Sequence, residues 1–539
     1  MKKVIISLLF TFIVTVASSQ DSGVLSVDSL NQAFINWYNQ SPQLDKIQGA
    51  SVEQAYNELL KGKTPGKKIV VAVIDGGVDI LHPDLAGKIW TNTDEIANNG
   101  IDDDNNGYTD DVHGWNFIGN EKGENIVYEN MEYVRILKKL TPDFSNITSI
   151  DQVDPDDVQY YNLYLKCKQK YDEELSKYKS VSENIKNFEK RLETSKDVLK
   201  NYLKKDKFTL EDVEEIKSDR ESVKLSKEFY LKLYKRGFSE EGLTAQKNYI
   251  NKYLQYYLNL EFEPRLTIND NPYDINDINY GNNDVKGERP DHGTFVSGVI
   301  AANRGNGFGT DGISSNVEIM VLRVVPDGDE RDKDVALAIR YAVDNGANII
   351  NMSFGKYYSI YNAMMESAIR YADDHNVLMV KSAGNESDNL DLIECFPTNK
   401  YLDGGKAKNW INVGATSNKS GKNFCGTFSN YGKNSVDVFA PGVNIVSLSP
   451  EKRYDMANGT SFSGPVVAGV AALVWSYFPE LTASELKTML LESVNKYDKL
   501  KVIVPNKQGK KNKSKFAELS ITGGTINAYN AIKKASSAN

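Results

Sequence analysis

The sequence predicts an α/β protein with a doubly wound, mostly parallel sheet flanked by helices, plus an all-α insertion. Short apolar runs rich in β-branched residues recur along the chain, first at 69–74, and helical stretches separate several of them. That alternation is typical of buried parallel strands in a doubly wound sheet. Residues 156–260 contain no proline and space their apolar residues by threes and fours, which predicts long helices.

The predicted strands and helices divide the chain into five parts. These are a signal peptide (1–19), a short N-terminal segment (20–67), the first part of the α/β domain (68–145), the helical insertion (146–261) and the second part of the α/β domain (262–539). After the first strand, further strands are expected near 319–325, 347–352, 377–381, 410–414 and 435–439. A helix is expected at 333–345, where apolar residues follow a helical period and Gly346 ends the pattern.

The first residues predict export from the cytoplasm. Lys2 and Lys3 precede an apolar run from 4 to 16, and small residues follow at 17–19, which is the pattern of a secretory signal peptide. The alternative is a membrane anchor, but thirteen helical residues span only about 20 Å of the roughly 30 Å hydrocarbon layer. We therefore expect a secreted or periplasmic bacterial protein with no membrane span in the mature chain.

Composition excludes several classes of function. The chain has 539 residues and a net charge of −9, so a nucleic-acid-binding surface is not expected, since phosphate contacts need clustered Lys and Arg. Three cysteines are too few for a disulfide scaffold, and four histidines leave little material for a multi-histidine metal centre.

The helical insertion is predicted to form two or three long helices folded into a coiled-coil-like hairpin. Thr209 with Asp212 resembles a capping box, and Ser239 offers another helix start. The seam is expected to be core packing between these helices rather than a cofactor site. It comprises Tyr171, Leu175, Tyr178, Val181, Ile185, Phe188, Leu192, Leu199 and Tyr202.

Four polar residues stand where reactive groups are often placed. Ser461 follows Gly459-Thr460 and precedes Pro465, so it lies at or just before a helix N-terminus, where free N–H groups could stabilise an oxyanion. His292 also starts a helix rich in small residues. Asp75 and Asn385 each follow a strand, at the edge where open α/β sheets place ligand-contacting groups. Each residue alone could equally be a cap or a turn residue.

Taken together, these segments resemble a known family. The segments 73–78, 292–298, 383–385 and 459–465, in the chain order Asp, His, Ser, look like the signature segments of the subtilisin-like serine proteases. The resemblance covers 68–118 and about 265–535. Residues 20–67 are shorter than the propeptide usual in that family, which leaves open that this segment stays and packs on the core.

The resemblance implies the chemistry of a serine endopeptidase acting on peptides or proteins. Ser461 would be the nucleophile, His292 the general base and acid, Asp75 the group that orients His292, and Asn385 an oxyanion donor. The segments Ser353-Phe354-Gly355 and Ala383-Gly384 would bind the substrate. The alternative is a non-catalytic binding protein that keeps the fold and uses the helical insertion for a partner. The insertion itself is either passive or an exosite for protein substrates.

Two further sites are expected from the sequence. Asp102, Asp104 and Asn106 alternate before Gly107, with Asp110 close behind, which matches the first half of an EF-hand-like loop and indicates a structural calcium site. The alternative is a solvated turn, because position twelve is His113 rather than Glu. Cys395 precedes Phe396-Pro397, which in the family borders the pocket for the residue before the cleaved bond, and Cys425 begins a loop expected nearby. They are expected to form a disulfide or to remain two buried thiols.

Overall fold

The computed structural model describes residues 30–538. It divides into two compact units, a helical unit (133–262) and an α/β unit formed by the chain on either side of it. The predicted insertion start at 146 lies inside the helical unit. The predicted signal peptide (1–19) lies outside the described residues. Within 30–538 we find no helix both long and apolar enough to cross a membrane.

The α/β unit is built on a nine-stranded sheet, in the order β10-β13-β7-β6-β5-β4-β1-β3-β2. All its pairs are parallel except β10 with β13. This confirms the predicted fold class. The strands are β1 Ile69–Asp75, β2 Gly114–Asn116, β3 Val317–Arg323, β4 Ile349–Met352, β5 Leu378–Ser382, β6 Trp410–Thr416, β7 Val438–Pro441, β10 Asn495–Lys496 and β13 Gly524–Thr525. Two small hairpins pair β8 Ile445–Ser449 with β9 Arg453–Ala457, and β11 Lys501–Ile503 with β12 Lys513–Lys515.

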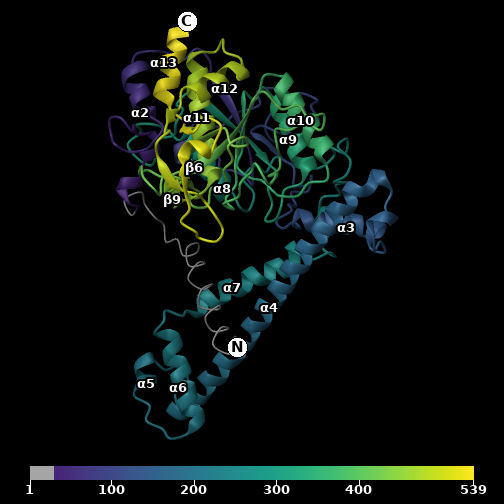
Figure 1. The fold of residues 1–539 in the computed structure, drawn as a ribbon, viewed down its shortest axis with the longest axis vertical. Helices are drawn as coiled ribbons and strands as arrows, with labels where there is room; N and C mark the ends of the chain where they lie inside the picture. The colour runs from purple at the N-terminus through teal and green to yellow at the C-terminus, as the bar shows by residue number, and fades with distance from the viewer. Residues whose placement is uncertain (1–29, 539) are drawn as a thin grey trace. The chain divides into compact units, whose positions relative to one another are not determined.

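Helices cover both faces of this sheet (Figure 1). Ile69, Val71 and Val73 of β1 pack in one core with α8 Asp291–Ala301, α11 Thr460–Tyr477, α12 Ala483–Glu492 and α13 Ala528–Ala538. Ala72 and Ile74 face the opposite core, formed with α9 Asp332–Asp344 and α10 Asn362–Asp374. Alternate residues of β1 thus enter two apolar layers, which explains why its sequence is apolar on both faces.

The N-terminal segment is part of the α/β core. Trp37 and Tyr38 are fully buried in the same core as α11. The Trp37 indole donates to the Asn444 carbonyl at 2.9 Å, and the Tyr38 hydroxyl donates to the Asp311 carbonyl at 2.9 Å. The segment also contains the short helix α2 Val52–Gln54 and a π-helical turn at Ala55–Leu59.

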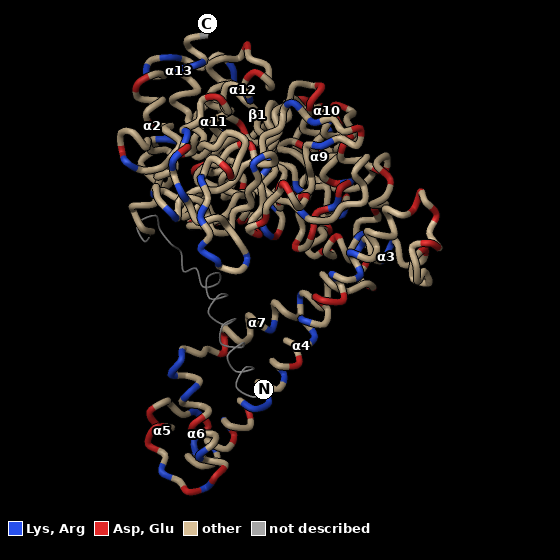
Figure 2. The backbone as a smooth tube through the Cα atoms, in the orientation of Figure 1, with Lys and Arg blue, Asp and Glu red and all other residues tan. Residues whose placement is uncertain are grey.

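The helical unit is dominated by α4 Val158–Leu203, a helix of 46 residues. It follows α3 Glu132–Phe144 and precedes α5 Leu210–Glu214, α6 Glu221–Tyr234 and α7 Glu240–Lys252. Lys, Arg, Asp and Glu are interspersed along it (Figure 2). As predicted, Thr209 and Asp212 form a capping box, and the Ser239 hydroxyl caps α7.

The long helices of this unit pack through their predicted seam. Tyr178 of α4 stacks on Tyr253, just after α7, with ring centroids 3.9 Å apart. Further along α4, Glu189 pairs with Lys247 at 2.8 Å, so α7 runs antiparallel to α4. Leu199 and Val213 are fully buried in a small core with residues of α6. The helical unit therefore buries apolar side chains of its own.

Candidate active site

The four predicted reactive residues come from four different elements of the α/β unit. Asp75 is the last residue of β1, Asn385 follows β5, His292 is in the first turn of α8, and Ser461 is in the first turn of α11. Since β1, β4 and β5 are parallel, their carboxyl ends lie at one edge of the sheet. The topology therefore places the ends of these strands beside one another, as open α/β folds do at their ligand sites.

Asp75 and His292 form a close pair. The Nδ1 atom of His292 lies 2.8 and 2.9 Å from the two carboxylate oxygens of Asp75, which is 3 % exposed. A carboxylate accepts, so Nδ1 carries the hydrogen and Nε2 keeps its lone pair. Gly293 permits this approach, because a Cβ atom there would lie 2.2 Å from the Gly77 carbonyl oxygen and 3.3 Å from the Asp75 Cβ.

The same pair sets the charge preference of His292. Burial lowers the pKa of the imidazole, but the negative charge and hydrogen bond of Asp75 raise it more, so the pKa of His292 lies above its ordinary value of 6.5. The His292 side chain remains 42 % exposed, with Phe462 on one side at a ring separation of 5.8 Å. His292 is thus held in one tautomer by Asp75 yet open to solvent and to a reacting molecule.

Ser461 lies in the first turn of α11, where its own backbone N–H is an unpaired donor among the described residues. Its hydroxyl donates to the Ser353 carbonyl oxygen at 3.0 Å, and the hydrogen bonds among the described residues include none from Ser461 to His292. The Thr460 N–H donates to the Asn385 side chain. The next N–H of the first turn is that of Ser461, and it is therefore the backbone donor available beside the Ser461 hydroxyl.

Asn385 is oriented by Thr460. Its Oδ1 atom accepts from the Thr460 N–H at 2.8 Å and from the Thr460 hydroxyl at 2.9 Å. With Oδ1 engaged, Nδ2 is left as the donor, and among the described residues it has no hydrogen-bond partner. The exposed Asn385 amide and the Ser461 N–H can therefore both donate to an oxygen atom next to the Ser461 hydroxyl.

The predicted substrate-binding segments are tied to α11 by two serines. The Ser353 hydroxyl donates to the Ser461 carbonyl, and the Ser382 hydroxyl donates to the Thr460 carbonyl, each at 2.8 Å. These bonds place the segments that begin at Ser353 and at Ser382 on either side of the start of α11. Gly384 needs its lack of a side chain, because it has φ +108° and a Cβ atom would lie 2.4 Å from Asn430 Nδ2.

The predicted calcium ligands are only partly brought together. Asp102 accepts from the backbone N–H groups of Asn106 and Gly107, and Asp110 accepts from those of Asn99 and Gly100, so their carboxylates brace the loop. Asn106 contacts both Asp104 and Asp111 through its side-chain amide.

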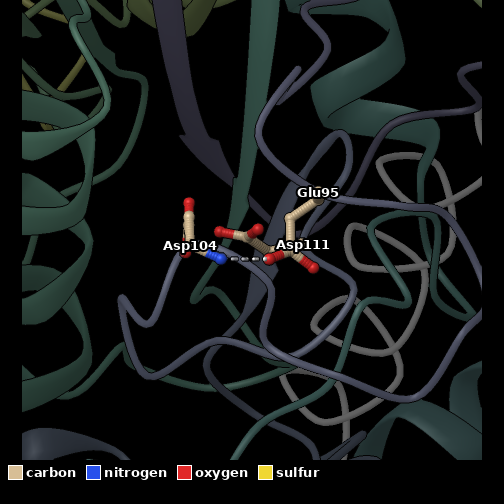
Figure 3. A group of neighbouring side chains, drawn as sticks. All are labelled: Glu95, Asp104 and Asp111. Carbon is tan, nitrogen blue, oxygen red and sulfur yellow. Dashed lines mark hydrogen bonds between the residues drawn. The ribbon is translucent and has the colours of Figure 1, made fainter.

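A different carboxylate cluster forms around Asp104. Glu95, Asp104 and Asp111 place oxygen atoms within 4.8 Å of one another. Figure 3 shows these three side chains converging, with the Asp104 backbone N–H donating to Glu95 at 3.3 Å. Burial raises the pKa of Glu95 and of Asp111. The sequence pattern missed both residues as ligands, because no regular spacing connects Glu95 to the Asp/Asn run.

The predicted disulfide is not formed. Cys395 and Cys425 are both buried free thiols, as is Cys167. They belong to one apolar cluster but face different groups, since the Cys395 sulfur lies 3.4 Å from the Lys381 ammonium and the Cys425 thiol faces the Gly426 carbonyl. Of the two alternatives, the structure has the pair of buried thiols.

Comparison with known proteins gives a family model that matches most of the chain and several similar proteases. A sequence model of the subtilase family, Peptidase S8, matches residues 66–516. The thermophilic serine proteinase of Bacillus sp. (strain AK1) is 36 % identical over 208 residues, which cover 38 % of this chain and 45 % of that protein. The major intracellular serine protease of Bacillus subtilis (strain 168) is 32 % identical over 233 residues, covering 42 % of this chain and 69 % of that protein. The cell wall-associated protease of the same strain is 34 % identical over 205 residues, covering 38 % of this chain and 21 % of that protein. The chain thus spans less than half the length of two of these three relatives.

Proposed function

Because the chain belongs to the subtilase family, we propose that it is a serine endopeptidase whose nucleophile is Ser461. The observation that carries this proposal is the Asp75–His292 hydrogen bond at 2.8 Å, with the nitrogen opposite it left to accept a proton. The Ser461 hydroxyl, the Ser461 N–H and the Asn385 amide complete the set of groups that acyl transfer needs.

The proposed reaction forms and then hydrolyses an ester on Ser461. The Ser461 oxygen attacks the peptide carbonyl carbon while its proton passes to His292 Nε2, and the negative charge that develops on the carbonyl oxygen is met by the Asn385 amide and the Ser461 N–H. The C–N bond then breaks, and His292 returns the proton to the leaving amine. Water attacks the ester in the same way, with His292 as base, and releases the acid and the free Ser461 hydroxyl.

Asp75 is proposed to orient His292 and to stabilise its protonated form. The support is geometric and electrostatic, since both Asp75 oxygens lie within hydrogen-bonding distance of Nδ1 and Asp75 raises the pKa of His292. A serine hydroxyl is a weak nucleophile without a positioned base, so this pair is what would make Ser461 reactive.

Hydrolysis of an unfolded protein by purified wild type and Ser461→Ala tests the proposal. We expect the variant to lose activity by a factor on the order of 10⁶, because the nucleophile and its base act as a unit. The matched control is Ser463→Ala, at a buried serine two residues along the same helix whose hydroxyl has no hydrogen-bond partner among the described residues. Full activity in Ser461→Ala would refute the mechanism.

We further propose that Glu95, Asp104 and Asp111 hold a structural Ca²⁺. The support is the chemistry of the donor set, because three carboxylates that converge within 4.8 Å supply the hard oxygen ligands that Ca²⁺ prefers. A divalent cation would also offset the repulsion between these carboxylates. The bound ion would stabilise the loop and takes no part in the proposed peptide hydrolysis.

The protein is also proposed to act outside the cytoplasm. The support is the sequence of residues 1–19 alone, with its two lysines, apolar run and small-residue end. Expression of the full chain in a bacterium, followed by fractionation and intact-mass measurement, tests this. We expect the exported protein to lack residues 1–19, whereas a cytoplasmic chain that keeps them would refute the assignment.

The helical unit is proposed to be an arm that binds protein substrates or a partner. Its own packing allows the arm to be shortened. The Tyr178–Tyr253 stack and the Glu189–Lys247 pair join α4 to α7 and the turn after it, and neither contact uses α5 or α6. Replacing 192–239 with a Gly/Ser turn keeps both contacts. We expect cleavage of short peptides to persist and cleavage of folded proteins to fall. If the variant cleaves both substrate types at the wild-type rates, the replaced residues are passive.

A further inference from the structure

One buried lysine beside the proposed active site has no carboxylate partner. The α/β unit buries three lysines almost completely, namely Lys333, Lys356 and Lys381. Lys333 pairs with Asp270, and Lys356 pairs with Glu132 and Asp332. Lys381 is 1 % exposed, and within residues 30–538 no ion pair joins it to an acidic group. Because burying an unpaired ammonium is costly, the missing anion needs an explanation.

The groups that contact the Lys381 ammonium do not supply that anion. It donates to the Ser382 carbonyl at 2.9 Å and lies 3.4 Å from the Cys395 sulfur. Burial raises the pKa of Cys395 more than the Lys381 charge lowers it, so this residue is a neutral thiol at neutral pH. One carbonyl and one thiol leave the positive charge of Lys381 without a counter-charge.

The nearby carboxylates are engaged elsewhere. Glu386 accepts from the Tyr357 hydroxyl at 2.6 Å, from the Asn385 N–H at 2.8 Å and from the Asn430 amide at 3.2 Å. Glu330 interacts electrostatically with Lys356. Both carboxylates influence Cys395 through their charge, but neither forms an ion pair with Lys381.

The Lys381 ammonium is held between the two backbone segments that flank Ser461. Its neighbour Ser382 directs its hydroxyl to α11, so strand alternation sends the Lys381 side chain to the opposite face of β5. There it meets Gly355, where a Cβ atom would lie 3.2 Å from the Lys381 nitrogen and 2.9 Å from the Cys395 sulfur. Gly355 is two residues from Ser353, whose carbonyl accepts the Ser461 hydroxyl.

This placement determines which part of a substrate approaches Lys381. If the acyl carbon lies at Ser461 and its oxygen at Asn385, the residue that carries that carbonyl lies between the segments starting at Ser353 and at Ser382. Gly355, in the first of these segments, lies directly against the Lys381 and Cys395 side chains, because a Cβ atom there would lie 3.2 Å from the Lys381 nitrogen and 2.9 Å from the Cys395 sulfur. The side chain of the residue before the cleaved bond is therefore directed toward Gly355 and the Lys381 and Cys395 side chains beside it.

We propose that Lys381 is a specificity-determining residue that favours substrates with an acidic side chain immediately before the cleaved bond. This rests on the proposed endopeptidase function. The substrate carboxylate supplies the counter-charge that the folded chain lacks, in a site of low dielectric where the attraction is strong. Glutamate is favoured over aspartate, because the ammonium lies deep and the longer side chain approaches it more closely.

The test compares kcat/KM for peptides that differ only at the residue before the cleaved bond. Wild type is expected to cleave the Glu peptide at least tenfold faster than the Gln peptide. Lys381→Met is expected to lower this ratio of kcat/KM values to one or below, whereas Lys381→Arg is expected to keep it. The control is Lys419→Met, which makes the same exchange at an exposed lysine.

The outcomes distinguish a failure of the specificity proposal from a failure of the endopeptidase function on which it rests. A wild-type ratio of Glu to Gln at or below one would overturn the specificity proposal whether or not Lys381→Met folds. An unchanged ratio in folded Lys381→Met would overturn it as well. In both cases cleavage that depends on Ser461 leaves the endopeptidase function intact. If wild type cleaves no peptide of the set and a fluorophosphonate does not label Ser461, the endopeptidase function fails instead.

Discussion

The Ser461 hydroxyl donates to the Ser353 carbonyl oxygen at 3.0 Å, and the Ser353 hydroxyl donates back to the Ser461 carbonyl oxygen at 2.8 Å. This reciprocal pair ties the nucleophile's first helical turn to the segment expected to bind the substrate backbone. It also means that the Ser461 hydroxyl must turn away from Ser353 before it can give its proton to His292. Catalytic hydrogen bonds of this kind often form only when the substrate is bound.

Removing the side-chain amide of Asn385 is expected to slow turnover without abolishing it. Asn385→Ala should lower kcat by about 10²–10³, as loss of one oxyanion donor does, while KM changes little. Steady-state kinetics on a short peptide measures this. Thr460→Val, which removes the hydroxyl that accompanies the N–H on Asn385 Oδ1, should cause a smaller loss. A larger change in KM than in kcat would mean that Asn385 binds the ground state.

The activity is expected to rise with pH through the pKa of His292. The base must be neutral to accept a proton, and Asp75 raises its pKa above the ordinary 6.5, so the acid limb of kcat/KM should have its midpoint above 6.5. Asp75→Asn removes the charge that raises the pKa, so the residual activity should show a lower midpoint. A midpoint that does not move in Asp75→Asn would show that another group controls the limb.

Chelation is expected to lower the thermal stability of the α/β unit. A cation bound only by the folded state adds about 2.7 kcal/mol at a hundredfold excess over Kd, so a chelator should lower Tm by several degrees. Calorimetry of wild type and of Asp104→Asn with Asp111→Asn measures this, and the double variant should be less sensitive to chelator. The control is Asp103→Asn, whose carboxylate accepts from Ile96 and Asn99 outside the cluster. An unchanged wild-type Tm would exclude the calcium site.

The N-terminal segment is expected to be needed for stability of the folded protein. Trp37→Ala should cost about 3–5 kcal/mol, because the indole is fully buried in the main core. Leu44→Ala in the same segment should have little effect, since Leu44 is 59 % exposed. Urea unfolding measures both changes. Equal stability of Trp37→Ala and wild type would mean that the segment is dispensable for the fold.

Much of the fold could be predicted because it depends on local patterns. The buried strands β1 and β3 to β7 carry apolar residues on both faces, and the capping residues Thr209 and Ser239 mark helix starts by side chains close in sequence. The pairing of Asp75 with His292 joins residues 217 positions apart. It could be expected only because several motifs occur together in one order.

The parts that could not be predicted depend on which partner a side chain meets in three dimensions. Asp102 and Asp110 have the spacing of cation ligands, yet the carboxylates whose oxygens converge are those of Glu95, Asp104 and Asp111. Lys381 stands out because no described acidic group forms an ion pair with its ammonium, and no sequence pattern can reveal that absence. Likewise, only the structure shows that Cys395 and Cys425 face different groups, the Lys381 ammonium and the Gly426 carbonyl, and remain thiols.

The central claim is that Ser461 is a nucleophile activated by His292, and covalent labelling tests it most directly. The protein is incubated with a fluorophosphonate, digested and mapped by mass spectrometry. We predict one adduct per chain, on Ser461, formed far more slowly in His292→Ala and not at all in Ser461→Ala. Peptide hydrolysis by a protein whose Ser461 stays unmodified, or an adduct on another serine that abolishes activity, would contradict the account.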